Sequence, residues 1–180
     1  TNVAMNVEAD RVEAATGKVT MFDGRETAPA AATPDMFLDS AGNSVRNASM
    51  TGRATGVPGV MPMLGVAHAR FGVLPWNELF GTVIAAADTG FLIAPRLGRF
   101  VNSSGEKSNA PDVRALFSRP DGTPVQTGDI HRNPDYAETL RALASRGPRA
   151  LHEGSIAEAI VAKVNEDPLP AGMTLADLAG

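Results

Sequence analysis

Proline and glycine residues divide most of this chain into short helical segments. From Pro58 to Phe71 the apolar residues recur at helical spacing, and Gly72 is expected to end that helix in the left-handed conformation. Pro75 begins a second helix, which ends at Gly90. The chain holds 18 glycines and 13 prolines. Because proline is tolerated at the start of a helix and glycine favours its end, this punctuation predicts several short helices.

Further helices are expected after Gly90. They cover 93–101, 111–117, a segment from Pro134 to just before Gly147, one from Ser155 onwards and a last short one from Thr174. Asn133 is expected to cap the helix that Pro134 opens, and Ser155 with Glu158 is expected to form a capping box. The turn-forming residues 119–124 predict a tight reversal with a small β-hairpin.

The N-terminal part of the chain lacks the helical pattern. Residues from Glu13 to Phe22 predict a hairpin or strand, in which Ala15 to Gly17 form the turn and the apolar residues alternate with polar ones. The segment from Ala30 to Thr55 has no sustained period and is expected to be an extended surface loop. The fold class is therefore mainly α with a short N-terminal β-hairpin. Three parts are expected: a hairpin segment 1–29, an extended loop 30–57 and a helical subdomain 58–180.

Composition limits what the chain can bind. Its 180 residues suit one domain, and a hydrophobic share of 43% is enough for a core. A net charge of −4 leaves no basic footprint for nucleic acid, and no apolar stretch is long enough to span a membrane. Cysteine is absent, and no two histidines lie three or four positions apart. No nucleic acid, membrane, metal or cofactor is expected as a partner.

No signal peptide is expected in this sequence, so any export of the parent protein is expected to be encoded upstream.

Arg25 is the candidate binding residue. It lies between the strand-like segment that ends near Phe22 and a turn that contains Pro29. A planar guanidinium held at such a place can bind a carboxylate through two parallel hydrogen bonds. It can also serve the structure alone by pairing with Asp23 or Glu26. Spacing leaves both interpretations open.

Seven motifs follow one another in an order that resembles the large subunit of γ-glutamyltransferases. The resemblance runs from about Ala15 to Ala179. Each motif is unspecific by itself, but their shared order is hard to obtain by chance. They are residues 22–29 (FDGRETAP), 56–59 (GVPG), 68–76 (HARFGVLPW), 85–91 (AAADTGF), 136–140 (YAETL), 151–157 (LHEGSIA) and 173–178 (MTLADL).

The resemblance implies a chemistry that this chain does not carry out alone. Such enzymes are precursors that cleave themselves, and the new N-terminal threonine of the small subunit attacks the γ-glutamyl amide of glutathione or a similar substrate. That threonine would lie beyond Gly180, so no catalytic residue is expected within the chain. Arg25 sits where the family's arginine binds the α-carboxylate of the γ-glutamyl group. The implied fold is the helical layer of an αββα sandwich of the N-terminal nucleophile hydrolase type.

The resemblance also implies partners and leaves alternatives open. The expected partners are a γ-glutamyl substrate and the small subunit of the same precursor, and a homodimer of the piece is a further expectation.

The residues before the strand depart from the family pattern. A glycine-rich run normally precedes the strand, whereas this chain has Asn6 to Arg11 there. Met5 is therefore interpreted as the start of a truncated reading frame or an engineered piece, with Thr1 to Ala4 as vector residues. Relatives are often periplasmic or extracellular, and the compartment of this chain is left unknown. The alternative function is a helical interaction module or truncated gene product without chemistry.

Overall fold

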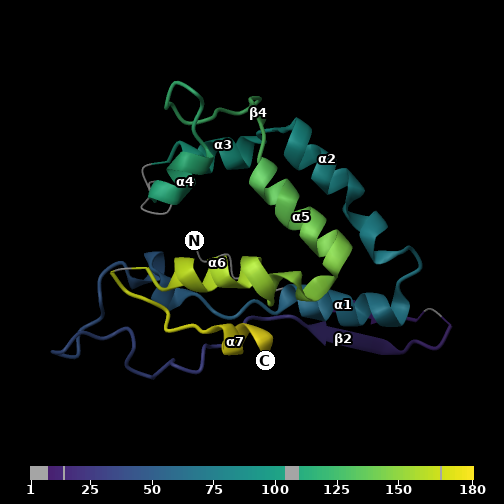
Figure 1. Cartoon of the computed structure of the whole chain (residues 1–180), viewed down its shortest axis with the longest axis horizontal. Coiled ribbons are helices and arrows are strands. Elements are labelled where there is room, and N and C mark those ends of the chain that lie inside the picture. The colour runs from purple at the N-terminus through teal and green to yellow at the C-terminus, as the bar shows by residue number, and fades with distance from the viewer. Residues whose placement is uncertain (1–7, 14, 104–109, 167) are drawn as a thin grey trace. The chain divides into compact units, whose positions relative to one another are not determined.

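The computed structural model of the chain describes residues 8–13, 15–103, 110–166 and 168–180 (Figure 1). The interpretation of Met5 and the four residues before it falls outside these ranges. The chain divides into two compact units, one made of Thr1–Trp76 with Arg146–Gly180 and the other of Asn77–Ser145. The part boundaries expected after residues 29 and 57 stay a prediction.

The first unit is mainly helical, with one two-stranded antiparallel sheet. Its strands and helices are β1 (Glu8–Val12), β2 (Val19–Asp23), the 3₁₀ helices η1 (Ala48–Met50) and η2 (Gly52–Ala54), α1 (Val60–Phe71), the 3₁₀ helix η4 (Pro148–Leu151), α6 (Gly154–Val164) and α7 (Leu175–Ala179).

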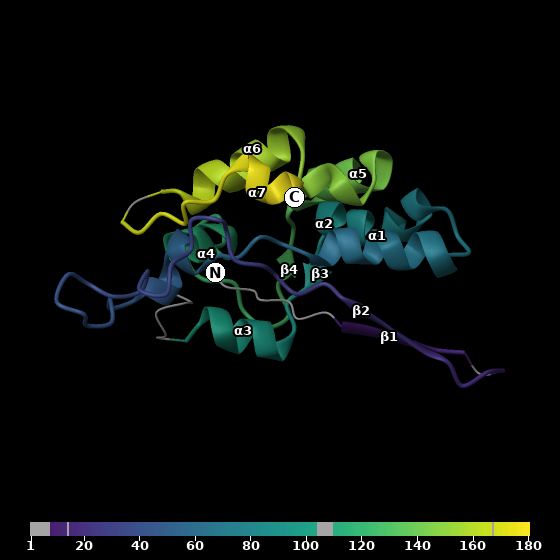
Figure 2. The same cartoon turned by 90° about the horizontal axis from the view of Figure 1, so that it is seen from below.

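The predicted hairpin is confirmed, and it begins earlier in the chain than expected. Val12 pairs with Val19 at the turn end and Glu8 pairs with Asp23 at the other end. Figure 2 shows the two strands side by side. The turn is closed by hydrogen bonds from Gly17 N–H to Glu13 O and from Glu13 N–H to Lys18 O, at 2.8 and 2.9 Å. The edge of the Phe22 ring faces the Phe71 ring of α1, with 5.9 Å between centroids. The hairpin therefore packs on α1.

Helix α1 matches its prediction, but its last residue is followed by a different backbone geometry. Pro62 lies in the first turn, where its missing N–H costs little. Gly72 has φ −65° and ψ 142°, which is extended and not left-handed as expected. A Cβ at Gly72 would lie 2.4 Å from Cδ2 of His68, so this position needs glycine for space. Gly72 N–H donates to His68 O at 2.6 Å, and the chain leaves the helix there in the extended conformation.

The helix caps near the C-terminus also differ from expectation. Helix α6 begins at Gly154, and its N-cap Glu153 has no side-chain cap bond, so the capping box expected at Ser155 is wrong. Ser155 is already inside the helix, where its backbone cannot adopt the extended geometry of a cap. A capping box does occur at α7, where Thr174 Oγ1 accepts from Asp177 N–H and Asp177 Oδ2 accepts from Thr174 N–H.

The core of the first unit joins residues from both ends of the sequence. Val57, Ala157, Ala171, Met173 and Leu178 are buried together, and Met173 is 1% exposed. The segment from Ala30 to Thr55 holds turns and the two 3₁₀ helices, in keeping with the expected loop. Two hydrogen bonds attach this loop to distant segments: Ala30 N–H to Asp177 Oδ1 at 2.8 Å and Arg53 N–H to Leu169 O at 2.9 Å.

The second unit is also mainly helical. Its elements are α2 (Gly81–Thr89), β3 (Phe91–Leu92), α3 (Pro95–Val101), α4 (Pro111–Leu116), β4 (Ile130–His131) and α5 (Pro134–Arg146), whose last residue lies in the other unit; the 3₁₀ helix η3 (Trp76–Phe80) precedes α2. Ile93, Val101 and Val125 form its buried core, with Leu97 and Phe117 packed against them. The helix expected from Pro75 is thus a 3₁₀ segment followed by an α-helix.

Strand pairing explains the other differences in the second unit. The helix expected from Ile93 begins at Pro95, because β3 pairs with β4 and Ile93 N–H donates to Asp129 O at 2.8 Å. The expected small hairpin at residues 119–124 is a tight turn closed by a single bridge between Ser118 and Pro124. Asn133 caps α5 as predicted, since its Oδ1 accepts from Tyr136 N–H at 2.9 Å. Among the described helices, none combines the length and the apolar character that crossing a membrane requires.

Candidate functional site

Arg25 lies in the loop that leaves β2, and its backbone is held by the residue that ends the strand. Arg25 N–H donates to Asp23 Oδ1 at 2.8 Å, while Gly24 between them is buried. The Arg25 side chain is 61% exposed, and its Nη2 lies 3.7 Å from Glu26 Oε1. Such a long, solvent-exposed ion pair contributes little energy. The guanidinium is therefore accessible on a fixed backbone and can exchange Glu26 for another carboxylate.

The backbone behind Arg25 is held by the segment 56–59. Thr27 and Val57 exchange two hydrogen bonds, from Thr27 N–H to Val57 O at 3.2 Å and from Val57 N–H to Thr27 O at 2.8 Å. A Cβ at Gly59 would lie 2.7 Å from Arg25 O, and one at Gly56 would lie 2.7 Å from Cγ of Glu26. The two segments pack backbone against backbone. Gly59 is also the N-cap of α1.

Two of the three histidines have structural contacts of their own. His68 Nε2 lies 2.8 Å from Leu74 O, and its ring meets the Trp76 ring at 5.3 Å between centroids. His131 is buried between the rings of Phe91 and Phe117, at 5.6 and 4.9 Å. In the described part of the chain, no cluster of three or more His, Cys, Asp or Glu side chains could hold a metal ion.

The third histidine, His152, was missed by sequence reasoning as a part of this site. It is 5% exposed, and its Nε2 lies 2.7 Å from the carbonyl oxygen of Pro58, within the segment that supports Arg25. These two residues are 94 positions apart in the sequence. No local pattern signals such a contact, although the motif that contains His152 and the motif that contains Pro58 both contribute to the family resemblance.

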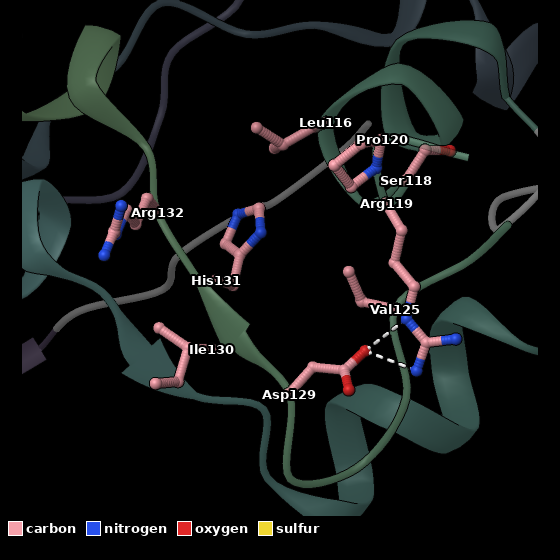
Figure 3. Close-up of a pocket in the computed structure, with 9 residues that line it drawn as sticks. All are labelled: Leu116, Ser118, Arg119, Pro120, Val125, Asp129, Ile130, His131 and Arg132. Carbon is pink, nitrogen blue, oxygen red and sulfur yellow. Dashed lines mark hydrogen bonds and ion pairs between the residues drawn. The ribbon is translucent and has the colours of Figure 1, made fainter. Parts of the chain in front are cut away.

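A pocket of about 470 Å³ lies in the second unit (Figure 3). His131 points into it, and Leu116, Pro120 and Val125 form apolar parts of its wall. Nε and Nη2 of Arg119 both lie 2.7 Å from Oδ2 of Asp129. This pair lowers the pKa of the Asp129 carboxyl and raises the pKa of Arg119, in each case mainly through the hydrogen bond between them. Their charges offset each other, so the pocket offers no net charge from this pair to select an ionic ligand.

Comparison with known proteins links the chain to one family. A family model described as gamma-glutamyltranspeptidase matches residues 11–180. The glutathione hydrolase proenzyme of Pseudomonas aeruginosa is 35% identical over 156 residues, which cover 84% of this chain and 27% of that protein. The chain spans about a quarter of the length of the curated relatives it matches, with shares of 27%, 23% and 26% for three of them.

Solved structures show the same relationship. The γ-glutamyltranspeptidase of Pseudomonas nitroreducens complexed with L-DON matches with a TM-score of 0.84 and 32% identity, over 98% of this chain and 51% of that one. The γ-glutamyltranspeptidase of Helicobacter pylori matches with a TM-score of 0.88 and 28% identity, over 99% of this chain and 51% of that one.

Proposed function

Because the chain belongs to the γ-glutamyltranspeptidase family, we propose that it is part of the large subunit of such an enzyme, with Arg25 as its carboxylate-binding residue. The observation that carries the proposal is the state of Arg25: an accessible guanidinium on a loop whose backbone is fixed on both sides. In this role Arg25 binds the α-carboxylate of a γ-glutamyl group. The planar fork of arginine matches the two oxygens of a carboxylate and stays charged at any working pH.

The chemical step belongs to polypeptide outside this chain. A threonine hydroxyl attacks the γ-glutamyl amide carbon, the amine leaves, and the resulting ester passes its acyl group to water, an amino acid or a peptide. Several relatives are named glutathione hydrolase proenzymes, which favours glutathione-like substrates and a precursor that is processed. The proposed protein partner is therefore the small subunit of the same precursor. The expected homodimer has no support in the comparisons or in the described residues, and it is not retained.

The hairpin supports a role within a larger protein. Val12 and Val19 are paired across the two strands and Met21 lies two residues further along the same face. These three side chains are 63%, 60% and 64% exposed. A self-contained module would bury such a face, whereas a helical layer of an αββα sandwich leaves it for the missing sheets. This observation favours the large-subunit role over an independent interaction module.

The test is the substitution Arg25→Lys in a full-length protein that carries this segment. Lysine keeps the charge but cannot form the bidentate pair, and a hydrogen bond to a charged group contributes about 1.5–3 kcal/mol. The KM for γ-glutamyl substrates is expected to rise about 10- to 100-fold, with processing and subunit assembly intact. Arg46→Lys is the matched control, because Arg46 is another exposed arginine of the same unit. Unchanged kinetics in the Arg25→Lys enzyme would refute the assigned role.

A further inference from the structure

His152 lies between η4 and α6, and among the described residues its ring makes one hydrogen bond, whose direction is defined by the partner. Its Nε2 is 2.7 Å from the Pro58 carbonyl oxygen. A carbonyl oxygen only accepts, so Nε2 carries the hydrogen and donates, and Nδ1 of a neutral ring is then unprotonated. Nδ1 is buried and has no hydrogen-bond partner among the described residues. Among the described residues, the bond to Pro58 is therefore the one hydrogen bond of this buried ring.

The carbonyl that His152 holds belongs to the segment that supports Arg25. Immediately before Pro58, Val57 exchanges two hydrogen bonds with Thr27. Immediately after it, Gly59 lies so close that an added Cβ would be 2.7 Å from Arg25 O and 2.9 Å from Gly24 O. His152 therefore acts at the centre of a three-residue stretch that contacts the chain on both sides of Arg25.

The same elements are in close contact at two more points. A Cβ at Gly65 of α1 would lie 2.5 Å from Cγ of Pro148 in η4, so these two helices are in close contact. A Cβ at Gly24 would lie 2.9 Å from Cε of Met63, a buried residue of α1. Helix α1 is thus packed between η4, which precedes His152, and the loop of Arg25. A shift of α1 or of its first residues would move the Arg25 backbone.

We propose that His152 is a positioning residue for γ-glutamyl binding: its Nε2–H bond to Pro58 fixes residues 57–59 and, through them, the Arg25 loop. This inference rests on the proposed carboxylate-binding role of Arg25. His152 does not touch the substrate. It determines where the Arg25 guanidinium is presented, which matters because a bidentate carboxylate contact tolerates only a small displacement.

The first test uses the 180-residue chain and two substitutions. His152→Leu keeps an apolar side chain but removes the donor, while His152→Gln keeps an N–H donor. Exchange of the Val57 and Thr27 amide hydrogens is expected to be about tenfold faster in the leucine variant and close to normal in the glutamine variant. His131→Leu is the matched control, since it removes a buried histidine from the other unit. Equal exchange in wild type and a folded His152→Leu variant would overturn the proposal.

A spectroscopic test does not depend on whether the variants fold. The ¹⁵N shifts of the His152 ring in the wild-type chain distinguish the two neutral tautomers. The proposal requires the Nε2–H tautomer, and finding the hydrogen on Nδ1 would overturn it.

The kinetic test separates this inference from the proposed function. In the full-length protein, His152→Leu is expected to raise the KM for γ-glutamyl substrates about tenfold with kcat changed less than about twofold, and His152→Gln is expected to restore the KM. If Arg25→Lys raises the KM and His152→Leu does not, the positioning role is wrong and the proposed function stands. If Arg25→Lys leaves the KM unchanged, the proposed function fails, and amide exchange still tests the contact of His152.

Discussion

Gly59 is required by the space around it and not by its backbone angles. Its φ of −108° is accessible to any residue, yet an added methyl group would meet two carbonyl oxygens of the Arg25 loop. Backbone atoms cannot move aside as the end of a flexible side chain can. The glycines of the GVPG motif are therefore needed because residues 56–59 pack closely against the Arg25 loop.

Gly59→Ala is expected to destabilise the first unit by about 1–3 kcal/mol, because the added Cβ forces the two segments apart. Urea unfolding followed by circular dichroism measures the change. Gly81→Ala is the control, since no atom lies within 4 Å of a Cβ at that helical position and the expected change is within about 0.5 kcal/mol. Equal effects of the two substitutions would show that the close approach at Gly59 is not real.

The stability of the second unit is expected to depend on pH through His131. Burial lowers the pKa of His131 below its ordinary value of 6.5. In the unfolded chain the ring binds a proton at higher pH than in the folded chain, so acid favours unfolding. The contribution to stability is full above pH 6.5 and is lost as the pH falls through the depressed folded pKa.

His131→Phe is expected to remove this dependence, because phenylalanine fills the place between the two aromatic rings without titrating. Urea midpoints of the second unit between about pH 5 and 8 provide the measurement, with wild type as reference. A wild-type midpoint that stays constant over that range would contradict the prediction.

At the scale of elements, caps form where the backbone is extended before a helix. Thr174 meets that condition, with φ −118° and ψ 166°, and makes both bonds of a capping box with Asp177. The pattern of Ser155 and Glu158 has a similar hydroxyl and carboxylate, but Ser155 lies two residues after the N-cap Glu153, inside α6. Asp177 also links α7 to the loop that contains Ala30, because its Oδ1 accepts from Ala30 N–H across 147 positions of sequence.

Asp177→Asn is expected to reduce the acid sensitivity of the first unit. The Ala30 N–H, the Thr174 hydroxyl and the Thr174 N–H, in this order, lower the pKa of Asp177 below 3.8. Its stabilising contribution is therefore present above pH 3.8 and is lost as the pH falls through the lowered folded pKa. Unfolding midpoints compared at neutral and acid pH test this expectation. Glu158→Gln, at an exposed position of α6, removes the same charge and serves as the control.

At the scale of the whole molecule, the first unit is completed by the C-terminal segment. Its buried cluster combines Val57 with residues from Ala157 onwards, and the second unit is inserted between them in the sequence. Removing the last helix would thus expose the core next to the Arg25 support, and the candidate site depends on both ends of the chain.

The purified chain is expected to release no nitroaniline from γ-glutamyl-p-nitroanilide, because the proposed threonine nucleophile is not part of it. Absorbance of free nitroaniline measures the reaction, and a full-length glutathione hydrolase serves as the positive control. Turnover that persists in a highly purified sample and disappears on a substitution within the chain would contradict the assignment of the chemistry to another segment.

The sequence by itself determined the short helices, the N-terminal hairpin, the cap at Asn133 and the family, because helical periodicity, turn residues and motif order are local or linear properties. Only the tertiary structure decided that His152 holds Pro58, that β3 pairs with β4 and so delays α3 to Pro95, and that Gly72 is extended. It also decided which of the two capping patterns is used. The contact of His152 with Pro58 and the pairing of β3 with β4 depend on the close packing of segments that are distant in sequence, and no local pattern encodes which backbone atoms will meet.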